Sequence, residues 1–436
     1  MAECSEAPAN ERGVLRSNAL QFVVLMGVVS LFADVTYEGA RSITGPFLQI
    51  LGASAFWVGA VAGFGELVGY ALRLVSGYIS DRTRRYWTVT FIGYGVNLLA
   101  VPLLAFAGRW EVAAALIILE RFGKAIRTPA RDAMLSHATE HIGHGWGFGI
   151  HEALDSIGGV SGPLVVAAIL YLRKGAYQTG FAVLLVPALV ALAMLVCARR
   201  LYPPASECKS KTPKLATRGF ERTYWIYLAA VACVAAGYAD WALIAYHMGK
   251  TKMVPPEWIP IYYAIAMLVN GTAALVLGRL FDRVGVAVLI VSVVLSTFFA
   301  PLAFSTSHDL AIAGIILWGV GMAAEGSVMR AVIAKLVPSE KRGAAYGVFN
   351  TGYGVAWFAG SAAMGALYDW SVTALIVFSM AMQLAAIPLL YIVKRPPVSP
   401  AGPTIPAEKS GVIPLTGLES VPFATRRNFL PGRSSA

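Results

Sequence analysis

Residues 77–85 read Gly-Tyr-Ile-Ser-Asp-Arg-Thr-Arg-Arg and separate two long apolar runs. The skeleton of this stretch returns 201 residues later, where residues 278–285 read Gly-Arg-Leu-Phe-Asp-Arg-Val-Gly between two further apolar runs. Charged residues held between apolar runs are typical of tight, water-facing loops that join two membrane helices. Because the offset is close to half of the chain, the repeat predicts a duplicated six-helix unit.

The composition is that of a polytopic membrane protein. Of the 436 residues, 57% are hydrophobic and only 14% are charged, and the mean hydropathy of +0.65 does not fit a water-soluble globule. The formal charge of +11 would suit nucleic acid, but the basic residues lie in short loops and tails rather than on one surface. We therefore expect a lipid bilayer, and no nucleic acid, as a partner.

Twelve apolar runs are long enough to cross a bilayer, whose core needs about 20 apolar residues per helix. They cover residues 18–47, 55–79, 87–107, 110–135, 145–171, 178–198, 224–248, 258–279, 286–305, 310–336, 343–368 and 373–393. When the connections are assigned to alternate sides, 25 of the 35 lysines and arginines fall on the side of both termini and five on the other, with five inside the runs. This imbalance predicts that both termini lie in the cytoplasm, in a multi-pass protein of the cytoplasmic (inner) membrane.

The same count divides the chain into five parts, and we expect the protein to be a monomer. The parts are a cytoplasmic N-terminal tail (1–17), an N-terminal six-helix bundle (18–198), a basic cytoplasmic linker (199–223), a C-terminal six-helix bundle (224–393) and a disordered cytoplasmic tail (394–436). The N-terminal tail carries three glutamates, and no small-residue cleavage site follows the first run, so a cleaved signal peptide is not expected.

The repeated loop resembles the cytoplasmic signature G-x-x-x-D-R-x-G-R-[RK] of the major facilitator superfamily, which stands after the second helix and more weakly after the eighth. Arg84 occupies the position where that family usually has the turn glycine. Residues 120–133 also look like a pattern of bacterial and archaeal facilitators, and Arg121 resembles the buried arginine of the superfamily's fourth-helix signature. The resemblance covers residues 18–393 and implies two pseudo-symmetric six-helix bundles that rock about a midplane cavity.

Ionisable side chains are frequent inside the predicted helices, where each costs about 2.5–3.5 kcal/mol on insertion scales unless it faces a water-filled cavity or a partner. In the first run, Asp34, Glu38 and Arg41 stand at i, i+4 and i+7 and share one face. They are candidates for binding solute or protons. The structural alternative is a self-satisfied pair of Glu38 and Arg41.

Charges in other runs extend this candidate set. Glu66 lies near the middle of the second run, whereas Arg73, seven residues later, is expected to be an anchor that reaches the cytoplasmic surface. The C-terminal half is poorer in charge and is expected to contribute solute contacts, with Asp240 and Glu325 as its candidates. Protonation chemistry is expected mainly in the N-terminal half.

The fourth run carries one charged stripe, because Glu120, Lys124, Arg127 and Arg131 recur at positions 0, 4, 7 and 11. Such a stripe cannot face lipid. For Arg121 and Lys124, pairing with Glu120 and Glu152 alone is the structural alternative to a role in proton coupling. The complete predicted cavity set is Asp34, Glu38, Arg41, Glu66, Glu120, Arg121, Lys124, Glu152, Asp155, Asp240 and Glu325.

The end of the fourth run is predicted to belong to a cytoplasmic gate. Arg131 and Asp132 are expected to latch this gate by pairing with Asp81 and Arg82 of the first loop. The predicted gate residues are Gly77, Asp81, Arg82, Arg85, Arg131, Asp132, Asp282 and Arg283.

The fifth run combines charge with a glycine pattern. Glu152 and Asp155 precede Gly158, Gly162 and Pro163, which are predicted to form a tightly packed hinge, since small residues let helices approach and proline bends them. The run resembles the superfamily's antiporter signature, G-x8-G-x3-G-P-x-x-G-G, although Val and Ala at 166–167 replace its final glycines. The resemblance implies exchange of solute for protons.

Other classes of function find little support. The sequence contains no phosphate-binding loop, nucleophile elbow or Cys-x-x-Cys pair, so we expect no enzyme activity, cofactor or resident metal. The prediction is a secondary transporter for a small polar, charged solute, with proton-coupled efflux by antiport as the first hypothesis. The basic fourth run favours an anionic or zwitterionic solute. Alternatives are a proton-coupled uptake symporter for a small organic anion, a membrane receptor that binds solute without transporting it, and an integral membrane enzyme.

Overall fold

The computed structural model describes residues 9–139, 142–202, 220–338 and 341–394, and every element in these ranges is helical. The N-terminal half contains α1 (Ala9–Ile50), α2 (Ala55–Thr83), α3 (Tyr86–Leu103) extended by η1 (Leu104–Phe106), α4 (Trp110–Thr139), α5 (His144–Leu172), and α6 (Tyr177–Val183) followed by α7 (Leu185–Leu201). These segments correspond to the first six predicted runs. Helix α1 begins nine residues before the predicted run, because an existing helix extends at little cost once it is nucleated.

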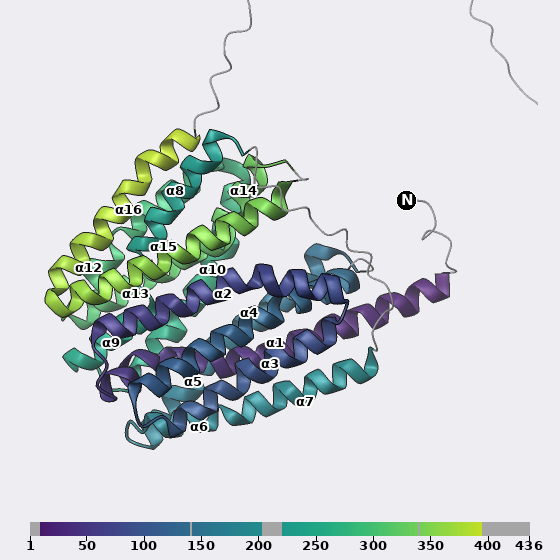
Figure 1. Ribbon diagram of the computed structural model, residues 1–436, viewed down its shortest axis with the longest axis horizontal. Coiled ribbons are helices and arrows are strands. Elements are labelled where there is room, and N and C mark those ends of the chain that lie inside the picture. The colour runs from purple at the N-terminus through teal and green to yellow at the C-terminus, as the bar shows by residue number, and fades with distance from the viewer. Residues whose placement is uncertain (1–8, 140–141, 203–219, 339–340, 395–436) are drawn as a thin grey trace, which may run out of the picture. The chain divides into compact units, whose positions relative to one another are not determined.

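The C-terminal half repeats this plan. It contains α8 (Arg222–Gly237) with α9 (Trp241–Thr251), α10 (Trp258–Val284), α11 (Ala287–Ser296) with α12 (Phe299–Ala303), α13 (His308–Ala323) with η2 (Ala324–Met329) and α14 (Arg330–Leu336), α15 (Arg342–Trp370) and α16 (Val372–Lys394). All twelve predicted runs are therefore helical, which confirms the all-α fold (Figure 1). Most of the predicted basic linker and nearly all of the predicted C-terminal tail lie outside the described residues.

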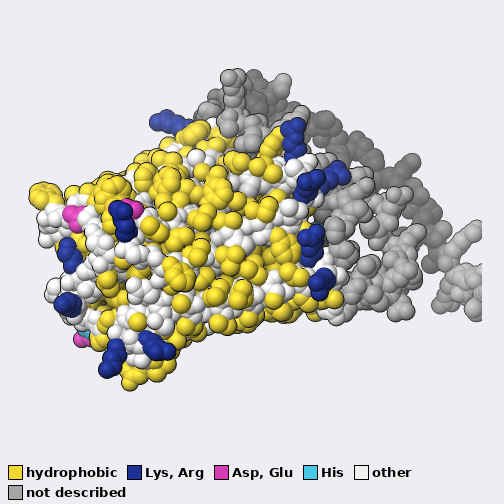
Figure 2. Space-filling model, turned by 60° about the horizontal axis from the view of Figure 1, so that its bottom comes forward, with side chains coloured by type: hydrophobic (Ala, Val, Ile, Leu, Met, Phe, Trp, Pro, Cys, Tyr) yellow, Lys and Arg dark blue, Asp and Glu magenta, His cyan; other side chains and the backbone are white. Residues whose placement is uncertain are grey.

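The lengths and surfaces of these helices suit a bilayer. Among the described residues, nine helices are long and apolar enough to cross a membrane, and the segment Ala287–Ala303 is apolar but shorter. Large apolar side chains such as Val186, Leu275 and Val276 are exposed. Figure 2 shows one face on which hydrophobic side chains cover the middle while lysine and arginine gather toward the two ends. An apolar band between charged ends is the surface that lipid requires.

The repeated motif ends two helices rather than forming two loops. Residues 77–83 are the last turns of α2, and residues 278–284 are the last turns of α10, so the connections to the next helices are only two residues long. Both helices end with a residue of positive φ: Arg84 at +52° and Gly285 at +68°. The charged residues of each motif lie at the end of a helix, because in each case the chain turns at a single residue of positive φ.

Glycines bring the two halves into contact. Helices α2 and α15 run side by side (Figure 1), and a β-carbon on Gly59 would lie 2.2 Å from the carbonyl oxygen of Ser361. A β-carbon on Gly45 of α1 would lie 2.0 Å from the carbonyl oxygen of Ala242 in α9. Only glycine permits such close approach of two backbones. The described part of residues 1–395 forms one compact unit.

Candidate functional site

The break between α8 and α9 places Asp240 at the interface between the halves. Asp240 caps α9 by accepting a hydrogen bond from the backbone N–H of Ala242 at 3.0 Å. Its other carboxylate oxygen lies 3.1 Å from a guanidinium nitrogen of Arg41, which is also 3.1 Å from Glu66. Arg41 therefore joins α1 to both α2 and α9. The structural alternative of a Glu38–Arg41 pair is wrong, because Arg41 has these other partners.

Arg121 extends the same network through α4. Its guanidinium lies 3.3 Å from Glu120 and 3.5 Å from Glu66. Glu120 also accepts a hydrogen bond from the side-chain amide of Asn97 at 2.7 Å. Glu66 is thus balanced by two arginines, and Glu120 has both a charged and a neutral partner.

Lys124 has a looser environment. Its ammonium lies 3.8 Å from Glu38 and 3.8 Å from the centre of the Tyr37 ring. Glu38 also accepts a hydrogen bond of 2.5 Å from Tyr263 of α10, so its carboxylate connects the halves. The structural alternative, in which Arg121 and Lys124 pair with Glu120 and Glu152 alone, is not observed, because Lys124 pairs with Glu38 and Arg121 also contacts Glu66. Lys124 therefore has one carboxylate and one aromatic ring as its partners.

A cavity of about 140 Å³ lies beside this network, between the two halves. Helices α1, α2 and α4 contribute most of the charged lining, while α13, η2 and α15 contribute residues from the other half. The lining residues are Arg41, Glu66, Gly69, Tyr70, Arg73, Arg121, Lys124, Met322, Glu325 and Trp357. Four of these side chains are cationic and two are acidic. The cavity is therefore polar, charged and bounded by both bundles, as solute sites of transporters require.

Glu325 enters the cavity from a π-helical turn. The segment η2 (Ala324–Met329) interrupts the α-helical pattern between α13 and α14. Such turns are rare and are frequent at functional sites. The hydroxyl of Tyr70 in α2 donates a hydrogen bond to Glu325 at 3.0 Å, which links the halves across the cavity. Among the described residues, no lysine or arginine lies within ion-pair distance of Glu325.

The position of Arg73 differs from the one predicted from the sequence. It was expected to reach the membrane surface, but it lines the cavity with its guanidinium centre 5.3 Å from the ring centre of Tyr70. The reason is visible in the spacing, because Glu66, Tyr70 and Arg73 stand at i, i+4 and i+7 on one face of α2. That pattern could have identified Tyr70 and Arg73 from the sequence.

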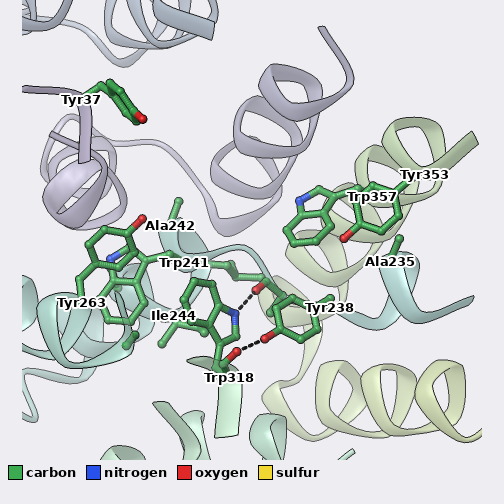
Figure 3. Close-up of a cluster of buried hydrophobic side chains, with 14 of the residues drawn as sticks. Tyr37, Ala235, Tyr238, Trp241, Ala242, Ile244, Tyr263, Trp318, Tyr353 and Trp357 are labelled. Carbon is green, nitrogen blue, oxygen red and sulfur yellow. Dashed lines mark hydrogen bonds between the residues drawn. The ribbon is translucent and has the colours of Figure 1, made fainter. Parts of the chain in front are cut away.

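Aromatic residues of the C-terminal half pack in a cluster that reaches the cavity through Trp357. Figure 3 shows Trp241, Tyr263, Trp318 and Tyr238 packed in one cluster, with Trp357 beside it. Trp318 donates a hydrogen bond to the carbonyl of Ala239 at 2.9 Å. Trp357 is 2% exposed and lines the cavity, so it has both a packing role and a place at the candidate site. An isolated aromatic in an apolar run gives no signal that distinguishes these roles.

The acidic residues near α5 form a separate group. Asp155 lies 3.3 Å from His151 and 4.0 Å from Arg131, and Glu152 is exposed. Asp34 is 7% exposed, and its Oδ1 has no hydrogen-bond partner among the described residues. None of the three carboxylates lines the 140 Å³ cavity. The structure thus divides the predicted cavity set into a central network and this second group.

The predicted gate latch is wrong for this conformation. Arg131 donates to its neighbour Asp132 at 3.0 Å and to Ser30 at 3.1 Å, so its guanidinium points into the N-terminal bundle. Asp81 instead accepts a hydrogen bond from Tyr86 at 3.0 Å. The latch does not form because the stripe that carries Arg131 faces α1. The remaining polar gate residues are exposed: Arg82, Arg85, Asp282 and Arg283.

The predicted hinge glycines are packing residues in this structure. A β-carbon on Gly158 would lie 2.4 Å from the carbonyl oxygen of Leu31, and one on Gly162 would lie 2.5 Å from that of Val35. Helix α5 continues through the buried Pro163 from His144 to Leu172. Close packing of α5 on α1 is therefore observed, while bending at this point stays a prediction.

Two helical halves around a charged interfacial cavity are the architecture of secondary transporters. The sequence profile of the Major Facilitator Superfamily matches residues 24–287 and 241–430. The chain therefore belongs to the Major Facilitator Superfamily.

Relatives and solved structures agree with this assignment. An uncharacterized protein of Mycobacterium tuberculosis is 40% identical over 390 residues, which cover 88% of this chain and 95% of the relative. An uncharacterized MFS-type transporter of Methanocaldococcus jannaschii is 25% identical over 374 residues, covering 84% and 92%. The crystal structure of the nucleoside transporter NupG superposes with a TM-score of 0.68 at 12% identity, covering 85% of this chain and 98% of that one. The last similarity shows the shared fold.

Proposed function

We propose that this transporter moves a small charged solute by alternating access and couples that movement to protons. The main observation in support of this proposal is the cavity of about 140 Å³, whose charged lining comes from both bundles. A site shared between two bundles is exposed to one side or the other when the bundles rock. Following the distribution of positive charge, we place both termini in the cytoplasm.

One end of the bundle interface is closed, which supports alternating access. At the end where α1 passes into α2, Asp369 of α15 accepts hydrogen bonds from the backbone N–H groups of Ala55 and Phe56 at 3.1 and 2.9 Å. This carboxylate caps α2 from the opposite half, where a negative charge stabilises a helix N-terminus. To open the closed end, the protein must break these contacts between the halves.

Glu325 is the carboxylate best placed to carry the proton. Glu66, the other acidic residue of the lining, lies within 3.5 Å of two arginines, and protonating it would leave those charges unpaired. Glu325 accepts a hydrogen bond from the hydroxyl of Tyr70, and the phenol of Tyr353 is a second neutral neighbour of its carboxylate. Protonation of Glu325 removes its negative charge, and every buried cation keeps the partner that it already has. This proposal moves the proton site from the N-terminal half to η2.

The lining favours cotransport of solute and proton. Four cationic side chains face the cavity, so a bound anion would stabilise a proton on Glu325, and each would increase the affinity for the other. Antiport, and with it efflux, is the second candidate. It is supported by the close packing of Gly158 and Gly162 on α1, in the helix that resembles the antiporter signature.

A flux assay tests the proposal. The purified protein is reconstituted in liposomes that contain a pH-sensitive dye, and pools of small acids, zwitterions and bases are added outside. We expect one pool to change the internal pH, with acidification for cotransport and alkalinisation for antiport. Empty liposomes and the Glu325→Gln variant are the controls. If labelled solutes cross without any proton movement, the proposed coupling is wrong.

A further inference from the structure

We infer that the solute carries an oxyanionic group, a carboxylate or a phosphate, which Arg73 and the indole N–H of Trp357 bind from opposite halves of the cavity. This inference rests on the proposed function, because it takes the 140 Å³ cavity as the solute site. Both side chains line that cavity, Arg73 from α2 and Trp357 from α15. The solute is therefore negatively charged, and the guanidinium of Arg73 and the indole N–H of Trp357 are the groups that recognise it.

Arg73 is distinguished from the other cations of the lining by its partners. Arg41 and Arg121 each contact two carboxylates, and Lys124 lies 3.8 Å from Glu38. No carboxylate of the described residues lies within ion-pair distance of Arg73. Its Nε is buried without a hydrogen-bond acceptor, and its recorded contact is with the ring of Tyr70. An arginine in this state has a planar set of donors available for an oxyanion.

Trp357 supplies the second, independent observation. Its Nε1 is buried and has no acceptor among the described residues. The two neighbouring tryptophans behave differently, because Trp241 donates to the carbonyl of Ser42 at 3.1 Å and Trp318 to that of Ala239 at 2.9 Å. Figure 3 shows the indole nitrogen of Trp357 without a bond to any residue drawn. Since buried tryptophans usually find a partner, this N–H is available to a ligand acceptor.

The remaining lining explains why an anion is favoured over other solutes. Glu66 is already balanced by Arg41 and Arg121, and Glu325 accepts a hydrogen bond from Tyr70. A cationic solute would therefore face the four cations of the described lining, with Glu325 as its one acidic residue that is not paired with a cation. A neutral solute would leave the guanidinium of Arg73 without a counter-charge. The volume of about 140 Å³ suits a small organic acid rather than a lipid or a peptide.

Calorimetric titration of the purified full-length protein tests this subsite. The probes are two acids with their neutral amides, benzoate with benzamide and lactate with lactamide, and inorganic phosphate as a separate arm. We expect at least one anion to bind and its amide, where one exists, to bind at least tenfold more weakly. Arg73→Gln should weaken anion binding tenfold or more, as the loss of a charge-assisted bond implies. Trp357→Phe, which keeps an aromatic ring, should weaken it about threefold to tenfold.

Matched variants separate this effect from misfolding. Arg73→Lys keeps the charge but not the planar donors and should give an intermediate loss. Arg173→Gln and Trp370→Phe change the same residue types at exposed positions and should leave affinity unchanged. Preference for phosphate or for a carboxylate then identifies the oxyanion.

Three results would overturn the inference: acids and amides that bind equally, anion binding that survives both Arg73→Gln and Trp357→Phe, or no saturable binding of any anion. Failure of the proposed function looks different. In that case anions bind and depend on Arg73, yet the reconstituted protein moves neither solute nor protons.

Discussion

The guanidinium of Arg41 lies 3.1 Å from the carboxylate of Asp240, a residue 199 positions later in the chain. The contact connects α1 of one half to the first turn of α9 in the other. Both side chains are largely buried, with 13% and 4% of their surfaces exposed. Because Arg41 also pairs with Glu66, the same arginine couples the bundle interface to the cavity.

Removing the charge of Asp240 should therefore weaken the interface. Asp240→Asn leaves Arg41 with Glu66 alone, and breaking a buried pair by removing one partner costs about 3–5 kcal/mol when no other partner exists. We expect a smaller but clear loss, measured as a lower melting temperature of the purified protein. Asp309→Asn is the control, since that side chain is 96% exposed and should have no effect. Equal melting temperatures for both variants would contradict a stabilising role for the pair.

Arg84 has an unfavourable backbone conformation at the end of α2. Its φ of +52° is left-handed, which costs a non-glycine residue about 1–2 kcal/mol. Arg84→Gly should raise the melting temperature without reducing transport. Arg85→Gly is the matched control, because Arg85 has a φ of −94° and gains nothing from glycine. A lower melting temperature for Arg84→Gly would show that the arginine side chain stabilises the turn by more than the backbone costs.

Gly59 should tolerate no side chain. A β-carbon there would lie 2.2 Å from the carbonyl oxygen of Ser361, so Gly59→Ala must push α2 away from α15. Overpacking of this kind costs about 1–3 kcal/mol, and we expect loss of transport together with a lower melting temperature. Gly95→Ala in α3 would meet nothing within 4 Å and should be neutral or slightly stabilising. Full transport by Gly59→Ala would mean that this close contact is dispensable.

Glu325→Gln should uncouple transport from protons. Glutamine keeps a hydrogen-bond acceptor for Tyr70 but cannot exchange a proton, so solute should still equilibrate across the membrane and the rate should no longer vary with pH between 5 and 8. Glu111→Gln, at an exposed position in α4, is the control and should retain the wild-type pH profile. If Glu325→Gln keeps that profile, the proton is carried elsewhere, with Asp34 and Asp155 as the next residues to test.

Much of the fold could be predicted from the sequence, because a bilayer imposes one length and one polarity on each spanning helix. The twelve apolar runs, and the repeat that relates residues 77–85 to 278–285, were sufficient to predict two six-helix bundles. The details of the turn were not predicted. A pattern of charges between apolar runs does not reveal that α2 and α10 remain helical to Thr83 and Val284.

The candidate site was only partly predictable. Helical spacing identified Glu38, Arg41 and the stripe of α4, since charges inside apolar runs are conspicuous. Which partner each charge takes depends on helices that are distant in sequence, so the pairing of Arg41 with Asp240 could not be read from local spacing. The same limit applies to Arg131, whose partners lie within its own bundle. The π-helical turn at Glu325 gave no signal in the sequence, because it is a property of the backbone alone.

The most direct test of proton-coupled alternating access is accumulation of a labelled solute against its own gradient. Once a solute is identified, its uptake into proteoliposomes is measured with an imposed pH gradient, without one, and with a protonophore. We expect the internal concentration to rise above the external one only while the pH gradient persists, and the protonophore to return it to equality. Uptake that stops at equal concentrations under all three conditions would contradict coupling to protons.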